Sequence, residues 1–274
     1  MLKQRLLTAA LLLPLLLALL FYAPNAVWGG LLALFLAGGA FEWARLGGFS
    51  RRGHVVLTTA VFLSCVSLLA LSLRWTPGQF NTLLLIPLCL IAAMFWVLVV
   101  PLVLRFRCRM PKPFVMAAVG WIVLVPTWLA ATVLQREPVL LLSIFAAVWV
   151  ADTAAYFTGR RFGKHKLAPS ISPGKTIEGV VGAYVAVLVY AAIALRFYSA
   201  DATGGAYLAV LTFGFVLTSL SVAGDLFESW TKRQAGTKDS GDLLPGHGGI
   251  LDRIDSLTAT LPFAVLFFAG LVLR

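Results

Sequence analysis

Apolar segments of about 20 residues recur along the whole of this 274-residue chain. A helix of about 20 residues is long enough to cross the hydrocarbon core of a bilayer. The segments lack the alternation of a membrane β-barrel, and lipid requires every backbone polar group to be paired, so helices are expected. We predict an all-α integral membrane protein with about nine transmembrane helices, roughly at 6–22, 26–43, 55–73, 83–104, 114–134, 139–156, 180–195, 207–223 and 257–273.

The distribution of basic residues orients these predicted helices. The chain has a net charge of +11, with 22 Lys and Arg against 11 Asp and Glu. If the N-terminus is cytoplasmic, 18 of the 22 bases fall in cytoplasmic segments, and only Arg74, Arg136, Arg196 and Arg274 fall opposite. The positive-inside rule therefore predicts a cytoplasmic N-terminus and a C-terminus on the other side. Bases sorted in this way favour membrane lipid as a partner and argue against nucleic acid.

Other features of the chain exclude some alternatives. The first apolar segment follows a basic start, as in a signal peptide, but no clear cleavage site ends it, so we expect a retained anchor. The cysteines at 65, 89 and 108 are scattered and form no CxxC pair, so neither a disulfide framework nor a zinc site is indicated. The three histidines lie far apart in the sequence. With no loop long enough to fold alone, we predict a single membrane domain, 1–274.

The acidic residues divide this domain informally into two parts. Up to about residue 140 the chain is apolar and contains only two acids, Glu42 and Glu137. Eight of the 11 acids lie at or near the cytoplasmic ends of the last four segments: Asp152, Glu178, Asp225, Glu228, Asp239, Asp242, Asp252 and Asp255. We interpret 1–140 as scaffold with lipid-facing and subunit-facing helices, and 141–274 as the part with the catalytic helices and loops.

Two pairs of acids flank the last polar loop. Asp225 and Glu228 are three residues apart and share a helix face at the end of an apolar segment. Acids at the edge of a membrane span usually mark a site, although a plain interfacial pair is the alternative. Asp252 and Asp255 repeat this spacing where the last helix begins, and N-terminal capping is the alternative for Asp255. If the two helices pack together, Asp225 and Asp252 reach one depth and suit Mg²⁺.

The loop between these acids combines glycines with bases. Glycines allow close backbone approach to a ligand, and bases hold phosphates. Carboxylates, Mg²⁺ and bases together are typical of nucleotidyl and phosphoryl transfer. We expect the phosphate-binding groups to be Ser229, Lys232, Arg233, Lys238, Arg253, Gly248 and Gly249.

A second polar loop, 159–179, contains "GKT" but is not a P-loop. Pro169 stands where the first glycine of that motif belongs, and no strand is expected before it. Lys175 remains a candidate phosphate ligand. Asp152, inside the preceding apolar segment, is a candidate site residue, and an ion pair with Arg160 or Arg161 is the competing structural interpretation.

The stretch "SWTKRQAGTKDSGDLLPGHGGILDRID", 229–255, resembles the motif of the phosphatidate cytidylyltransferase (CDP-diacylglycerol synthase) family. "SPGKTIEG", 172–179, is similar to a second segment of that family. The specific motifs cover only the second half of the chain. The fixed positions of the first motif are all met, by Ser229, Lys232, Arg233, Lys238, Asp239, Gly241, Pro245, His247, Gly248, Gly249, Asp252, Arg253 and Asp255.

The resemblance implies that CTP and phosphatidic acid react to give CDP-diacylglycerol and pyrophosphate. It also implies a Mg²⁺ requirement, a metal held by Asp225 and Asp252, room for a second cation such as K⁺, and a homodimer. Around the metal we expect Asp239, Asp242 and Asp255 to position its ligands or nearby bases, and His247 either to contact phosphate or to order the loop. The enzyme is expected in the plasma (inner) membrane with its active site at the cytoplasmic face, because CTP is soluble.

Two other functions fit part of the pattern. A CTP-dependent lipid kinase of the polyprenol type would transfer the γ-phosphoryl group instead of the cytidylyl group. An ion-coupled transporter would place acids near the bilayer midplane and show related halves. Here the acids cluster at one face and no repeat is visible, so the transferase is favoured.

Overall fold

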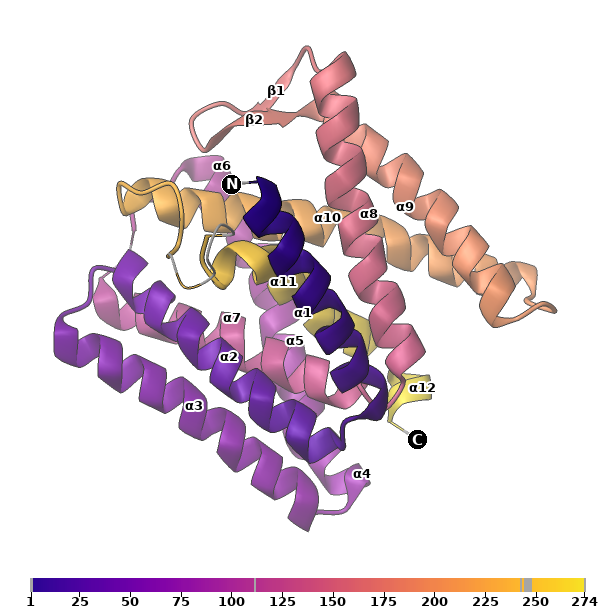
Figure 1. The fold of residues 1–274 in the computed structure, drawn as a ribbon, viewed down its shortest axis with the longest axis horizontal. Coiled ribbons are helices and arrows are strands. Elements are labelled where there is room, and N and C mark those ends of the chain that lie inside the picture. The colour runs from indigo at the N-terminus through magenta and orange to yellow at the C-terminus, as the bar shows by residue number, and fades with distance from the viewer. Residues whose placement is uncertain (1, 111, 242, 244–247, 274) are drawn as a thin grey trace.

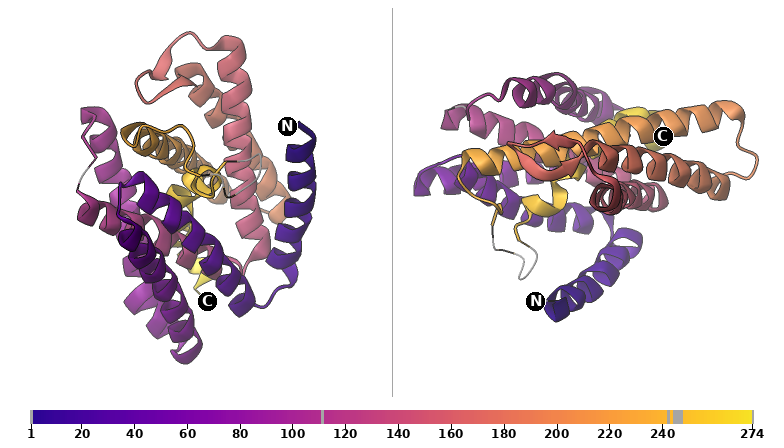
Figure 2. Two further views of the ribbon diagram at one scale, coloured as in Figure 1. Left: turned by 60° about the vertical axis from the view of Figure 1, so that its left-hand side comes forward. Right: turned by 90° about the horizontal axis from the view of Figure 1, so that it is seen from above.

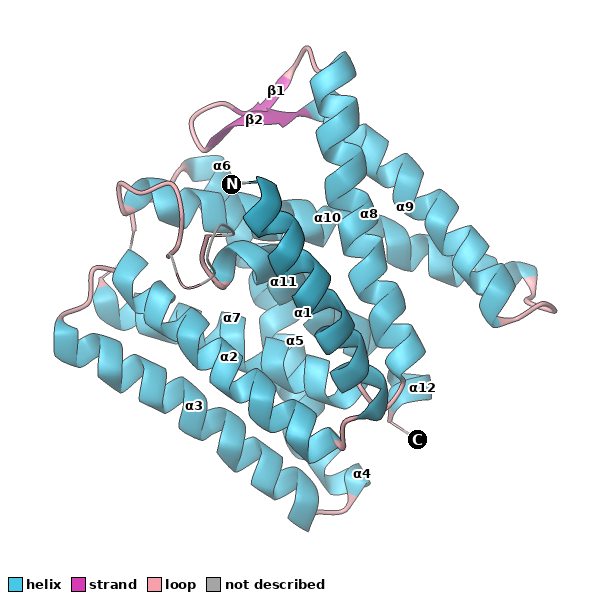
Figure 3. Cartoon of the chain, viewed as in Figure 1, coloured by secondary structure: helices cyan, strands magenta, loops and turns pink. Residues whose placement is uncertain are grey.

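The computed structural model describes residues 2–110, 112–241, 243 and 248–273, and most of them are helical (Figures 1 and 3). The first half contains α1 (Leu2–Tyr22), α2 (Asn25–Leu46), α3 (Arg51–Arg74), α4 (Pro77–Phe80), α5 (Ile86–Met94), α6 (Val100–Phe106) and α7 (Pro113–Leu134). The second contains α8 (Pro138–Phe162), β1 (Lys166–Ala168), β2 (Ser172–Thr176), α9 (Ile177–Tyr198), α10 (Gly204–Gln234), α11 (Leu251–Phe267) and α12 (Ala269–Val272).

Each of the nine predicted apolar segments is helical, which confirms the mainly helical fold class. In the described ranges, seven helices are long and apolar enough to cross a membrane, and α1 and α11 are not among them. The count of about nine spans and the orientation of the termini therefore stay predictions. The largest difference is in α10: the predicted span ended near residue 223, with Asp225 and Glu228 on a helix face just beyond it, and the helix continues to Gln234. Its last turns carry much of the charge that we had expected in a loop.

The fourth predicted span is one helical rod with two irregularities. Between Pro77 and Phe106, π-helical segments at Asn81–Leu85 and Phe95–Val99 join α4, α5 and α6. Each π-helical segment is followed two residues later by a proline, Pro87 or Pro101. Proline has no backbone N–H and crowds the preceding turn, and a π-turn is a common way to accommodate both effects inside a helix.

The helices form a bundle in which α11 is central. It packs against α10, α7 and α5, while α2 packs on α3 and α7, and α8 on α9. Figure 2 shows α1 at the edge of this bundle. Buried tryptophans tie α2 to α7: Trp43 Nε1 donates to Met116 O at 2.8 Å, and Trp128 Nε1 donates to Gly29 O at 2.8 Å. These bonds satisfy the indole N–H groups in an apolar core.

A short hairpin within the second polar loop departs from the all-α prediction. Strands β1 and β2 are antiparallel, and Thr176 at the end of β2 caps α9 by accepting a bond from Gly179 N at 3.1 Å. Glu178 in the first turn of α9 accepts bonds from the backbone N of His165 at 3.2 Å and contacts its Nδ1 at 2.6 Å. The hairpin thereby holds Lys175 at a fixed position near α10.

Packing between α2 and α7 leads to a test of stability. A Cβ on Gly120 would lie 2.5 Å from Trp43 Cδ1, and Trp43 is fully buried and hydrogen-bonded. We expect Gly120→Ala to destabilise the fold by about 1–3 kcal/mol through overpacking. The measurement is the unfolding midpoint in detergent. Gly78→Ala is the matched control, because nothing lies within 4 Å of its added methyl group. Equal midpoints for both variants would contradict this packing.

Candidate active site

The last turns of α10 present acids and a base on one face. Lys232 Nζ contacts Glu228 Oε2 at 2.9 Å, four residues earlier on the helix. Ser229 Oγ donates a long bond to Asp225 Oδ1 at 3.4 Å. Glu228 is 5% exposed, so its charge is held within the protein by the Lys232 ammonium.

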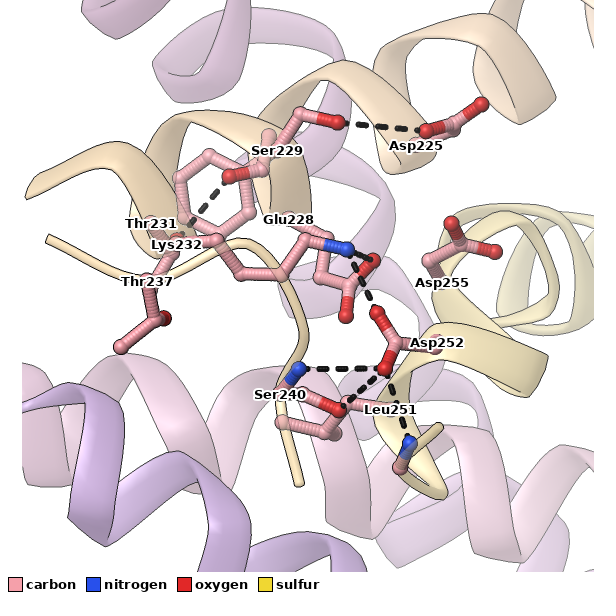
Figure 4. Close-up of polar contacts among 12 residues, drawn as sticks. Asp225, Glu228, Ser229, Thr231, Lys232, Thr237, Ser240, Leu251, Asp252 and Asp255 are labelled. Carbon is pink, nitrogen blue, oxygen red and sulfur yellow. Dashed lines mark hydrogen bonds and ion pairs between the residues drawn. The ribbon is translucent and has the colours of Figure 1, made fainter. Parts of the chain in front are cut away.

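Asp252, in the first turn of α11, joins this face to the polar loop (Figure 4). Its Oδ1 contacts Lys232 Nζ at 2.6 Å. Its Oδ2 accepts bonds from Gly249 N at 2.9 Å, Ser240 N at 3.1 Å and Ser240 Oγ at 3.0 Å. Lys232 therefore bridges acids from two helices, and Asp252 is held in one orientation from both sides.

A second group of charges surrounds Asp255, one turn further along α11. Asp255 interacts electrostatically with Asp225 of α10 and Asp152 of α8, and also with Lys175 of β2. Lys175 Nζ contacts Asp225 Oδ2 at 2.5 Å. The three carboxylates and one ammonium leave an excess of negative charge where α8, α10, α11 and the hairpin meet. The alternative role for Asp152 was an ion pair with Arg160 or Arg161. The described contacts do not include such a pair: Arg160 Nη1 donates to the Tyr156 hydroxyl, and the Arg161 guanidinium lies over the Phe162 ring.

These residues fit Mg²⁺ in their chemistry. Magnesium prefers oxygen ligands and is typically held by one or two carboxylates, and the excess negative charge suits a divalent cation. In the part of the chain that the structure describes, no three Asp, Glu, His or Cys side chains converge closely enough to hold a metal. Both oxygens of Asp252 already accept bonds. The assignment of Mg²⁺ to Asp225 and Asp252 thus stays a prediction.

The remaining predicted phosphate-binding residues belong to the end of α10, the polar loop and the first turn of α11. Arg233 joins the end of α10 to the hairpin, since its Nε donates to Ile171 O at 3.2 Å. Lys238, Asp239 and Arg253 are exposed, and Arg253 has a further contact within the protein. The predicted residues Asp242 and His247 lie outside the described residues.

Two glycines of the motif, Gly248 and Gly249, lie against the Asp252 carboxylate. Gly248 has a φ of +79°, and a Cβ there would lie 2.9 Å from Asp252 Oδ2. Only glycine accepts both conditions without strain. Gly249 gives its N–H to the same oxygen. A role for Gly248 and Gly249 in binding phosphate stays a prediction.

Sequence reasoning missed one acid, Glu42 of α2, which had been assigned to the scaffold. It is 2% exposed and accepts hydrogen bonds from Ser240 Oγ, Ile250 N and Leu251 N. The signal in the sequence was an acid inside an otherwise apolar segment, which is costly unless it has partners. Its partners lie about 200 residues away, so no local pattern revealed them.

Long apolar helices around clustered acids and bases are consistent with a membrane enzyme of nucleotidyl or phosphoryl transfer. The model of the cytidylyltransferase family matches residues 3–271. The chain is 39% identical to a phosphatidate cytidylyltransferase of Pseudomonas aeruginosa, over 98% of both chains. It is 51% identical to that of Haemophilus influenzae over 134 residues, 47% of this chain and 45% of the relative. The chain belongs to the cytidylyltransferase family.

Proposed function

We propose that the chain transfers the cytidylyl group of CTP to phosphatidic acid, giving CDP-diacylglycerol and pyrophosphate in phospholipid biosynthesis. The observation that carries this proposal is the near full-length similarity to the Pseudomonas aeruginosa phosphatidate cytidylyltransferase. The site is consistent with it, because acids and bases from α8, α10, α11 and the hairpin meet in one place.

The reaction joins two anions, so the protein must neutralise and align them. An oxygen of the lipid phosphate attacks the α-phosphorus of CTP, a new P–O bond forms, and the bond to the β-phosphate oxygen breaks. Pyrophosphate leaves with the electron pair. The lipid phosphate is already a competent nucleophile near neutral pH, so no strong general base is required. Positioning and charge neutralisation therefore supply most of the rate.

The proposed roles follow from where the residues lie. The bases that would hold phosphates are Lys175, Arg233, Lys238 and Arg253, together with Ser229 and the loop glycines. Lys232 contacts both Glu228 and Asp252 in the structure, so its proposed main role is to hold those two acids in place. Asp225 and Asp252 would hold Mg²⁺, with Asp255, Asp239 and Asp242 around them. When bound, Mg²⁺ would neutralise the triphosphate and stabilise the leaving pyrophosphate.

Location and assembly complete the proposal. CTP is soluble while the acyl chains of phosphatidic acid stay in lipid, so the site belongs at a membrane surface. The sorting of basic residues supports the cytoplasmic side of the plasma (inner) membrane as the location of this surface. A homodimer and a second cation such as K⁺ are proposed from the family resemblance alone.

The position of a radiolabel tests the reaction. Purified protein in detergent is incubated with phosphatidic acid, Mg²⁺ and CTP labelled at either the α- or the γ-phosphate. We expect α-label to enter the lipid and γ-label to appear in pyrophosphate, and EDTA in excess of Mg²⁺ to stop both. Entry of γ-label into an added isoprenoid alcohol would instead establish the kinase. Ion flux in sealed vesicles without lipid product would establish the transporter.

A further inference from the structure

Glu42 lies where α2 passes beneath the polar loop and the start of α11. Its Oε1 accepts a bond from Ile250 N at 2.9 Å. Its Oε2 accepts bonds from Leu251 N at 3.0 Å and from Ser240 Oγ at 2.9 Å. A buried carboxylate of this kind is tolerated because several donors satisfy it, and a helix N-terminus adds a favourable dipole.

The same chain segments hold Asp252. The Ser240 hydroxyl lies between the two carboxylates, with its Oγ 2.9 Å from Glu42 Oε2 and 3.0 Å from Asp252 Oδ2, so they share its single hydrogen. Gly249, which donates to Asp252, immediately precedes the two residues that donate to Glu42. Glu42 and Asp252 therefore hold the same two short segments of the chain, so a shift of either segment at Glu42 would also move the Asp252 carboxylate.

The surrounding glycines make room for Glu42. A Cβ on Gly241 would lie 2.6 Å from Glu42 Oε1, and a Cβ on Gly249 would lie 2.5 Å from Glu42 Oε2. On α2 itself, a Cβ on Gly38 would lie 2.6 Å from Ile250 Cδ1. The face of α2 and the loop thus fit each other closely, and two glycines of the family-like motif are accounted for by Glu42.

We propose that Glu42 is a positioning residue, which fixes the orientation of Asp252 by anchoring Ser240 and the start of α11 to α2. This inference rests on the proposed function and extends it to a helix in the first half of the chain. Glu42 does not touch substrate in this role. It acts through Ser240, Ile250 and Leu251, and its contribution is therefore distinct from simple stabilisation of the fold.

The test is Glu42→Gln in the full-length protein. Glutamine keeps the size of the side chain but turns one acceptor oxygen into a donor. That donor faces either Ile250 N–H, at the Oε1 position, or Leu251 N–H and Ser240 Oγ, at the Oε2 position. Removing a group that orients a metal ligand typically costs about 10–100-fold in activity or metal affinity. We expect kcat/KM to fall by about that factor, and the Mg²⁺ concentration for half-maximal rate to rise, in protein that remains monodisperse. Amide hydrogen exchange should also become faster across 248–251 without added Mg²⁺ or CTP.

Glu137→Gln is the matched control. Glu137 is the other acid of the first 140 residues, and its side chain makes no cap bond at the start of α8. It should leave rate, Mg²⁺ dependence and exchange at 248–251 unchanged. If neither the wild type nor this control makes CDP-diacylglycerol, the proposed function fails. If both do and Glu42→Gln matches them in kcat/KM, the positioning role fails.

A double variant separates positioning from stability. Because Glu42 acts partly through the Ser240 hydroxyl, the losses of activity in Glu42→Gln and Ser240→Ala should overlap in the combined variant. Losses that multiply would overturn the shared route. A lower unfolding midpoint with an unchanged kcat/KM and Mg²⁺ requirement in Glu42→Gln would show a structural role only, and would overturn the proposal.

Discussion

Asp252→Asn is expected to lower kcat by on the order of 10³-fold while the protein still folds. The Asp252 carboxylate is the point where the Lys232 ammonium, Ser240 and Gly249 N–H converge. Asparagine keeps the shape but removes the negative charge, and its NH₂ group must face one of these donors. The proposed metal would also lose an anionic oxygen ligand, which weakens both metal binding and stabilisation of the leaving group.

The measurement is single-turnover formation of CDP-diacylglycerol at a series of Mg²⁺ concentrations, together with CTP binding. Asp201→Asn is a matched control, because Asp201 is exposed in the turn that precedes α10, far along that helix from Asp225. The control should behave as the wild type. A folded Asp252→Asn protein that binds CTP and turns over normally with Mg²⁺ would show that the metal assignment is wrong.

Local sequence patterns predicted the helices because each one depends mainly on an apolar run of the right length. The end of α10 was missed for a physical reason. Its turns beyond residue 223 are polar, and hydropathy detects only segments that suit contact with lipid. The helix continues there because of its C-terminal cap and its packing against α11. The β1–β2 hairpin was missed because its strands are only three and five residues long and have no alternating pattern.

The candidate site was predictable where residues lie close together in sequence. Asp225 and Asp252 were proposed as metal ligands from their positions beside apolar segments, and α10 and α11 do pack together, while the metal itself stays a prediction. The pairing of Lys232 with both Glu228 and Asp252 required knowledge of that packing, since phosphate was the expected partner. Asp239 stays a prediction, because no described contact tests its role.

Lys232→Met is the second substitution with a large expected effect, and it acts on stability as well as on activity. Lys232 is the ammonium shared by Glu228 and Asp252, and it is largely buried between them. Glu228 Oε1 is buried without a hydrogen-bond partner among the described residues, so Lys232 is its main compensation. Removing one partner of a buried ion pair typically costs about 3–5 kcal/mol, because the remaining charge is left uncompensated.

We therefore expect Lys232→Met to lose about 3–5 kcal/mol in unfolding free energy, with no detectable product. Adding Glu228→Gln to this variant should recover part of the lost stability, because it removes one of the two uncompensated carboxylates. It should not recover the activity. Lys238→Met is the matched control: this lysine is exposed, so its loss should leave the unfolding midpoint unchanged and raise the KM for CTP. If Lys232→Met unfolds like Lys238→Met, the ammonium does not compensate the two acids, and its first role is to bind phosphate.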